Sequence, residues 1–273
     1  MCRKKSDTLY LATNRIHLAL TAFGKNPDFL MLDEQMDLSP YRVVFLPLCE
    51  RVSPRIIKHW KEYVRNGGCL VAVTRLNLME ESGCYRREPY PCGMTELFGL
   101  EIAENRELLN SQTDANMGVF DISSLPKTSV RLSCFRGTAN AERYVEEILP
   151  LTCTVLEKLS STCFAGSPLL TRNSYGMGTA LYVSAFLDVP GVRKMVRRVL
   201  EECGISLPDV ELPPEVSRIE RGGYLFYINS SSRKVDLEER ISGEILLGDA
   251  NSRETIALNP YEVLIARSSG KSR

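Results

Sequence analysis

The sequence predicts an α/β domain, with a parallel sheet and helices on both faces, followed by a small all-β antiparallel domain. Apolar runs that suit buried strands alternate with amphipathic helical stretches over the first two-thirds of the chain. One strand, helix and strand follow each other closely, with a Gly-Gly turn before the second strand. After a proline-rich stretch the pattern changes to short alternating strands only, which indicates the second domain.

The first part of the chain holds two short strand-like runs on either side of a helical pattern. We expect strands at residues 8–12 and 29–32, and a helix from about residue 14 to residue 23. Residues 41–46 (YRVVFL) form a continuous apolar run that ends at Pro47, which is typical of a strand buried on both faces.

The next helix has signals at both of its ends. Ser53 is a natural N-cap, and Pro54 suits the first helical position. Apolar residues then repeat at helical spacing, and the Asn-Gly-Gly sequence at residues 66–68 ends the helix. Residues 69–73 follow as another buried strand. Strand, helix and strand make a β-α-β unit, which implies parallel pairing.

The region from about residue 76 to residue 139 is irregular, with short strand-like pieces among Gly, Pro and polar clusters. Beyond it we expect strands at residues 152–159, 169–172 and 179–184. Residues 173–178 form the turn between the last two. Gly204 ends the amphipathic helix that follows. The apolar face of this helix consists of Val192, Met195, Val196, Val199, Leu200 and Cys203.

Residues 206–214 (SLPDVELPP) contain three prolines and no periodicity, which is typical of a linker. We therefore expect an α/β domain at residues 1–206, a linker at 207–215 and an antiparallel β domain at 216–273. The strands expected in the β domain lie at residues 216–219, 224–229, 234–238, 244–247, 255–258 and 263–266.

Composition excludes several classes of partner. Lys+Arg and Asp+Glu both number 34, so the balanced charge favours neither nucleic acid nor an anionic membrane. No apolar run reaches the roughly 18 residues of a membrane helix, and the basic start lacks the long apolar stretch of a signal peptide. The nine cysteines include no C-x-x-C pair. We expect buried or incidental free thiols and a cytoplasmic protein.

A search for catalytic or binding groups yields no site. His17 and His59 lie in predicted helices and are expected to be structural. The sequence contains neither a metal-binding histidine pair, nor a nucleophile elbow, nor a phosphate-binding loop. The acidic pairs at residues 80–81, 146–147 and 201–202 are adjacent, so their side chains point apart, and we expect them on solvated faces. We predict no catalytic residue, no metal ligand and no cofactor.

The β-α-β unit with its Gly-Gly turn resembles class I glutamine amidotransferases, which implies a flavodoxin-like fold. In those enzymes a cysteine nucleophile occupies the sharp turn directly after a strand of the 69–73 type. Here that turn is residues 74–77 (TRLN), and Cys69 lies five residues too early. No later His-x-Glu motif supplies a base. We expect the fold without the chemistry.

A second resemblance covers roughly residues 8 to 267. The segments that carry it are DLSPYRVV at 37–44 with Leu46-Pro47, YVRNGG at 63–68, LFGL at 97–100, NSYGMGTALY at 173–182, residues 218–229 and LNPYEV at 258–263. In this order and spacing they resemble the trimerisation domain and the small C-terminal β domain of glycoside hydrolase family 42 β-galactosidases. In that family a catalytic TIM barrel precedes these domains. We expect no counterpart of the two catalytic glutamates of the barrel, because a barrel needs some 200 or more residues and only about seven precede the first expected strand.

The resemblance implies a non-catalytic, oligomer-forming accessory region of a β-galactosidase-like glycoside hydrolase. A homotrimer is expected, with a glycoside hydrolase barrel on another chain as a possible partner. Aromatic residues of the irregular middle, namely Tyr85, Tyr90 and Phe98, are candidate interface residues, with core or loop packing as the alternative.

Two other functions stay open. An amidotransferase-like or other hydrolase would need Cys84, Cys92 or Cys163 as an atypical nucleophile with a depressed thiol pKa. Carbohydrate binding by the β domain would use Tyr224, Phe226 or Tyr227. However, Tyr224 and Phe226 share one strand face with Ile228, so we expect these two in the core and only Tyr227 outside.

Overall fold

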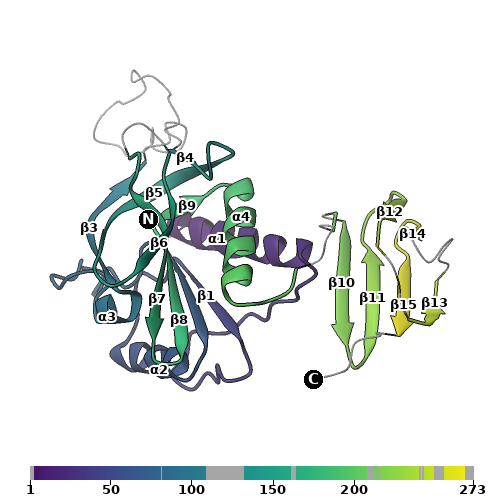
Figure 1. The fold of residues 1–273 in the computed structure, drawn as a ribbon, viewed down its shortest axis with the longest axis horizontal. Helices are drawn as coiled ribbons and strands as arrows, with labels where there is room; N and C mark the ends of the chain where they lie inside the picture. Colours follow the sequence, from purple (N-terminus) through teal and green to yellow (C-terminus); the bar gives the residue numbers. More distant parts are fainter. Residues whose placement is uncertain are drawn as a thin grey trace. The chain divides into compact units, whose positions relative to one another are not determined.

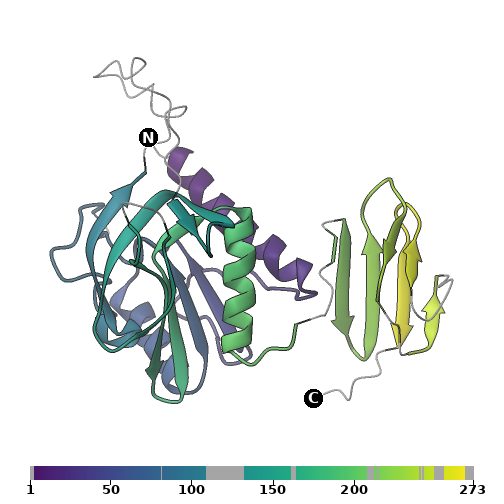
Figure 2. The same cartoon turned by 45° about the horizontal axis from the view of Figure 1, so that its top comes forward.

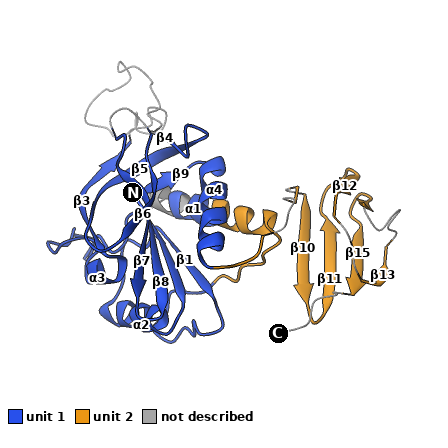
Figure 3. Ribbon diagram, viewed as in Figure 1, with its two compact units in different colours: residues 1–13, 30–203 blue, residues 14–29, 204–273 orange. Residues whose placement is uncertain are grey.

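The computed structural model describes residues 3–80, 82–108, 132–160, 164–207, 212–213, 215–239, 241, 243–248 and 255–267. In this part of the chain the fold is mixed α/β, with several sheets and a β-rich C-terminal part (Figure 1). The chain divides into two compact units (Figure 3). Unit 1 comprises residues 1–13 and 30–203, and unit 2 comprises residues 14–29 and 204–273.

Helix α1 (Arg3–Ala22) confirms the helix predicted from about residue 14, but the strand predicted at residues 8–12 is wrong. Burial explains the difference. Thr8, Ala12 and Ile16 are buried at steps of four residues, while Tyr10 is 67% exposed. A strand would bury alternate residues, so this stripe belongs to a helix that begins before residue 8. Residues 29–32, also predicted as a strand, form no strand in the structure.

The main sheet of unit 1 has the order β1-β2-β8-β7-β6. Its strands are β1 (Val43–Pro47), β2 (Cys69–Val73), β8 (Gly178–Val183), β7 (Pro168–Tyr175) and β6 (Thr154–Lys158). β1, β2 and β8 are parallel, as predicted, whereas β7 pairs antiparallel with both β8 and β6. The predicted parallel sheet is therefore mixed. The reason is local: two residues connect β7 to β8, and so short a connection joins only antiparallel neighbours.

Two of the helices begin at side-chain caps. Helix α2 (Pro54–Arg65) starts as predicted, because the Ser53 hydroxyl accepts a hydrogen bond from the Ile56 N–H at 3.3 Å. Helix α4 (Val189–Glu202) starts at Asp188, whose carboxylate accepts from the Gly191 N–H at 2.9 Å. Gly204 adopts a φ of 62° directly after the cap residue Cys203, as expected for a helix end.

The core of unit 1 lies between α2 and the main sheet. Trp60, Leu70 and Tyr182 are fully buried there, together with Leu97 and Phe98 of the short helix α3 (Thr95–Phe98). Because side chains alternate along a strand, Cys69 and Val71 point to the other face of β2. On that side Cys69 meets Cys203, which follows α4. In Figure 2 the green helix is α4, and it lies apart from α2.

A second, antiparallel sheet was missed by the sequence pattern. It contains β3 (Leu100–Glu107), β5 (Ala139–Pro150), β4 (Leu132–Cys134) and β9 (Ala185–Leu187). β8 ends at Val183 and β9 begins at Ala185, so the chain passes from one sheet to the other at Ser184. The Ser184 carbonyl accepts a hydrogen bond from the Glu146 N–H at 2.8 Å. The two sheets of unit 1 are thereby joined at this residue.

All six strands predicted for the β domain are present in unit 2. They are β10 (Val216–Arg221), β11 (Tyr224–Asn229), β12 (Val235–Leu237), β13 (Ile245–Leu247), β14 (Ile256–Leu258) and β15 (Val263–Arg267). They form an antiparallel sheet β10-β11-β15-β13 and a β12-β14 pair. Of the predicted linker, residues 208–211 and 214 lie outside the described residues.

The buried face of β11 is the opposite of the one predicted. Tyr227 is 1% exposed in the unit 2 core, whereas Tyr224 is 39% exposed and Phe226 is partly buried. The polar groups on the buried face have partners: Arg218 Nε donates to the Tyr227 hydroxyl at 3.3 Å, and the Asn229 amide donates to the Arg233 carbonyl at 2.7 Å. Satisfied polar residues can occupy a core face, so apolarity alone assigned the wrong side.

The β7–β8 hairpin packs directly on the end of α2. The Arg65 carbonyl accepts from the Met177 N–H at 3.0 Å, and the Gly68 carbonyl accepts from the Thr179 N–H at 3.1 Å. A Cβ atom on Gly178 would overlap the carbonyl oxygens of Val64 and Gly68. Gly178 is therefore required because two backbones approach each other closely. Two segments recognised separately in the sequence, at residues 63–68 and 173–182, are thus one contact in the fold.

We expect the Gly178→Ala substitution to lower the free energy of unfolding by about 3 kcal/mol, because the backbone oxygens in its way cannot move as a side chain can. Urea titration followed by the fluorescence of Trp60, the single tryptophan, measures the change. Met177→Ala in the same hairpin is the control. Met177 is 79% exposed, and its truncation should change the stability by less than about 0.5 kcal/mol. Equal stabilities of the two variants would refute the close-approach explanation.

Candidate functional site

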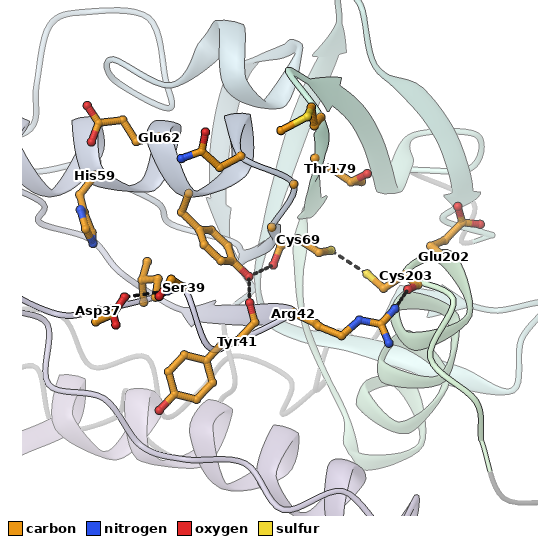
Figure 4. A pocket seen from close by; sticks show the side chains of 17 residues that line it. Asp37, Ser39, Tyr41, Arg42, His59, Glu62, Cys69, Thr179, Glu202 and Cys203 are labelled. Atoms are coloured by element: carbon orange, nitrogen blue, oxygen red, sulfur yellow. Dashed lines mark hydrogen bonds between the residues drawn. The ribbon is translucent and has the colours of Figure 1, made fainter. Parts of the chain in front are cut away.

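A pocket of about 560 Å³ lies where β2 and β8 begin, at the end of α2 (Figure 4). All of its lining residues belong to unit 1. They come from the segment before β1, the end of α2, the starts of β2 and β8, and the end of α4. The lining includes Asp37, Arg42, His59, Tyr63, Cys69, Gly178, Glu202 and Cys203. The structure therefore brings together the glycine-containing segments and two of the cysteines noted in the sequence.

Several polar groups around this pocket contact neighbouring backbone. The Tyr63 hydroxyl donates to the Tyr41 carbonyl at 3.0 Å, and His59 Nε2 lies 2.7 Å from the Met36 carbonyl oxygen. The Asp37 carboxylate accepts from the Ser39 N–H at 2.9 Å, and hydrogen bonding from the Ser39 side chain lowers the pKa of Asp37. These contacts hold the pocket wall in place.

Two thiols, those of Cys69 and Cys203, face each other in the pocket. Their sulfur atoms lie 2.7 Å apart and share a hydrogen bond. That hydrogen bond, followed by burial, raises the pKa of Cys69, whereas the same hydrogen bond, followed by the charge of Arg42, lowers the pKa of Cys203 against the effect of burial. The sequence places the two thiols 134 residues apart, so no local signal could have paired them.

A buried carboxylate occupies the other end of β2. Glu146 accepts from the Arg75 N–H at 2.7 Å and from the Tyr182 hydroxyl at 2.8 Å, and the Arg75 guanidinium forms an ion pair with Glu50. Burial raises the pKa of Glu146 to about 7. The prediction of a solvated acidic pair is wrong for Glu146, which is 1% exposed, because alternation along β5 turns it inward while Glu147 stays partly exposed.

This cluster lies at the turn that follows β2. Arg75 has a φ of 60° and Asn77 a φ of 49°, so two residues of this turn are in the left-handed region. The Asn77 amide donates to the Cys92 carbonyl at 2.9 Å and its carbonyl oxygen accepts from the Val52 N–H at 3.1 Å. A hydrogen-bond network therefore holds the turn in place.

The candidate nucleophiles are not gathered in the pocket. Cys84 lies in an exposed loop. Cys92 is 2% exposed, and burial raises the pKa of its thiol, which opposes the depression that a nucleophile needs. Cys163 lies outside the described residues.

The aromatic interface candidates have three different environments. Phe98 is 1% exposed and packs edge-on against Tyr182, with ring centroids 5.4 Å apart, so it belongs to the core. Tyr90 is partly buried and donates its hydroxyl hydrogen to the Arg86 carbonyl at 2.6 Å. Tyr85 is 56% exposed. Only Tyr85 of the three presents a largely free aromatic surface.

Two further features bear on the kind of site present. Among the described residues, no three His, Cys, Asp or Glu side chains are grouped so as to hold a metal ion. No described helix is long and apolar enough to cross a membrane.

Comparison with known proteins identifies relatives of this chain. The profile of the beta-galactosidase trimerisation domain matches residues 13–206. Beta-galactosidase Pbg of Clostridium perfringens is 24% identical over 248 residues, which are 87% of this chain and 34% of that protein. Beta-galactosidase BglY of Alicyclobacillus acidocaldarius is 25% identical, over 86% of this chain and 34% of that protein. The chain therefore spans about a third of the length of these curated relatives.

Solved structures share the fold over nearly the whole chain. The β-galactosidase from Bacillus circulans sp. alkalophilus superposes with a TM-score of 0.76 at 21% identity, covering 96% of this chain and 38% of that one. The β-galactosidase of the haloarchaeon Halorubrum lacusprofundi gives a TM-score of 0.78 at 18% identity, covering 96% and 36%. At these identities the likeness concerns the fold alone.

We expect the buried carboxyl of Glu146 to make stability depend on pH. Its pKa rises from 4.5 to about 7 on folding, so the carboxyl favours the folded state fully only below about pH 4.5. As the pH rises from about 4.5 to 7 this contribution is lost, and the free energy of unfolding falls by about 3 kcal/mol in total. Thermal unfolding of the wild type and the Glu146→Gln variant across pH 4–8 measures the difference.

The Glu146→Gln variant keeps an acceptor for the Arg75 N–H but cannot ionise. The melting temperature of the wild type should therefore fall relative to this variant as the pH rises towards 7. Glu147→Gln is the matched control, because Glu147 is the partly exposed neighbour in the same strand, and its pH profile should follow that of the wild type. Parallel profiles for the wild type and Glu146→Gln would contradict the assignment.

Proposed function

Because this chain belongs to the beta-galactosidase trimerisation domain family, we propose that it assembles as a homotrimer and serves a β-galactosidase-like glycoside hydrolase. The family match over residues 13–206 is the observation that carries the proposal. In this function the chain is an accessory and assembly part of carbohydrate metabolism and does not itself carry out hydrolysis.

The catalytic barrel enters the proposal as a partner. The chain spans about a third of its curated relatives, whose names identify them as β-galactosidases. We propose that a glycoside hydrolase barrel on another chain is held by this module, and that the module shapes its sugar pocket. A cytoplasmic location is part of the same proposal, since nine cysteines without a C-x-x-C pair suit a reducing compartment.

The domain division and fold relationship are also proposals. We propose an α/β domain at residues 1–206, a linker at 207–215 and a β domain at 216–273. For the α/β domain we propose a distant relationship to the flavodoxin-like fold of class I glutamine amidotransferases. The parallel β1-α2-β2 unit and the turn at Arg75 support it, while β7, which runs antiparallel to β8 and β6, departs from it.

An exposed apolar segment supports the assembly proposal. Leu30, Met31 and Leu32 of unit 1 are 43, 85 and 47% exposed. Exposed apolar side chains that follow each other are typical of sites where proteins associate. We propose that residues 30–32 contribute to the contact between copies. In a closed trimer each copy would present this segment to a different surface of the next copy.

Light scattering on the size-exclusion peak tests the assembly proposal. We expect a mass near three times 30.7 kDa, the mass of one chain. A monomeric mass at micromolar concentration would overturn the trimer and, with it, the main role proposed for the chain.

The double substitution Met31→Ser and Leu32→Ser tests the interface. Replacing two exposed apolar side chains by serine should leave the fold intact and shift the mass towards that of a monomer, with a loss of at least tenfold in trimer affinity. Tyr261→Ser is the control, because Tyr261 is also exposed, at 69%, on a different part of the chain. Circular dichroism confirms folding. A trimer that persists in the double variant would exclude this segment from the interface.

A further inference from the structure

The Cys69–Cys203 pair supports a function that is separate from assembly, namely thiol oxidation. Cys69 is the first residue of β2, and Cys203 caps the C-terminus of α4. Figure 4 shows the two side chains pointing towards each other at the pocket, with a sulfur–sulfur distance of 2.7 Å. We propose that these thiols are an oxidation site, which hydrogen peroxide converts into a reversible Cys69–Cys203 disulfide.

The geometry requires little movement for this bond to form. A disulfide bond is about 2.05 Å long, so the sulfur atoms must approach by less than about 1 Å. Both side chains line the pocket of about 560 Å³, through which a small oxidant reaches them. Among the described cysteines this is the pair whose sulfur atoms contact each other, whereas Cys49 and Cys92 direct theirs to the backbone carbonyls of Pro47 and Glu88.

The groups around the two thiols indicate which one is the nucleophile and which one is the resolving thiol. The Arg42 guanidinium donates to the Cys203 carbonyl at 3.0 Å, and its charge favours the Cys203 thiolate. This charge offsets the C-terminal end of the α4 dipole, which disfavours an anion. Cys69 is 5% exposed and keeps its proton, because its pKa is raised by the hydrogen bond with Cys203 and by burial. Cys203 is thus the nucleophile and Cys69 the resolving thiol.

The reaction balances in two steps. The Cys203 thiolate attacks one oxygen of hydrogen peroxide, the O–O bond breaks, and a sulfenic acid and hydroxide form. The Cys69 sulfur then attacks the sulfenic sulfur, its proton passes to the departing hydroxide, and water leaves as the S–S bond forms. In total two thiols lose two electrons, and one peroxide becomes two waters. A dithiol reductant reverses the change.

The disulfide would join two distant points of unit 1. It links the beginning of β2 to the end of α4, across 134 residues of sequence. Such a link constrains the unfolded chain, so the oxidised protein should melt about 5–10 °C above the reduced one.

Peptide mapping of the full chain tests the proposal. The protein is treated with hydrogen peroxide, its remaining thiols are blocked with N-ethylmaleimide under denaturing conditions, and it is digested with trypsin. Trypsin releases residues 66–75 and 199–218, which contain one cysteine each. We expect these two peptides to be joined in a species 2 Da lighter than their sum, since a disulfide replaces two S–H bonds. Dithiothreitol should separate them.

Single substitutions test the roles of the two thiols. Cys203→Ser and Cys69→Ser should each abolish the joined peptide and the rise in melting temperature. Cys153→Ser, which removes a partly buried thiol elsewhere in unit 1, should retain both. Arg42→Gln should slow the loss of the Cys203 thiol several-fold, and Arg42→Lys should restore it in part. In wild-type protein, absence of the joined peptide, or oxidation of Cys203 only to sulfinic acid, would overturn the proposal.

Discussion

The close approach of two backbones, at the end of α2 and at the β7–β8 hairpin, is the constraint on which unit 1 depends. Arg65 and Gly68 accept hydrogen bonds from Met177 and Thr179, and a side chain at Gly178 would displace the contact. The hairpin aligns β8 with β2 and makes β7 antiparallel to both. The same contact forms one wall of the pocket. This one backbone contact therefore contributes to the fold of unit 1, to the strand register and to the pocket.

The two ends of β2 carry different chemistry. At its beginning, Cys69 meets the thiol of Cys203 in an open pocket. At its end, the buried Glu146 accepts hydrogen bonds from the Arg75 N–H and the Tyr182 hydroxyl, at a turn with two residues in the left-handed region. Here the turn stabilises the junction of the two sheets of unit 1.

Membership of the trimerisation family gives these features a setting. The chain shares its fold with about a third of each β-galactosidase it matches. An assembly module needs a well-packed frame and apolar surface for its neighbours. In unit 1 the core around Trp60 is such a frame, and residues 30–32 are the surface that we propose for assembly. A thiol pair that links β2 to α4 would act on the frame and leave that surface unchanged.

The sequence by itself determined the elements whose signals lie within a few residues. Capping, turn geometry and periodicity are local, so the features that depend on them were predicted. These are the Ser53 cap, the glycines after α2, the β7–β8 turn and the six strands of unit 2. Residues 173–182 carried part of the resemblance to the family. Within them, glycine is the residue that fits at position 178, because two backbones approach each other closely there.

Only the tertiary structure decided which distant groups meet and which faces are buried. The helical stripe through Thr8 and Ala12, the buried face of Tyr227 and the burial of Glu146 depend on what packs against each strand or helix. The contact of Cys69 with Cys203 depends on how β2 and α4 pack, across 134 residues of chain. Periodicity records the spacing of side chains along one element, and it contains no information about the surface that the element will meet.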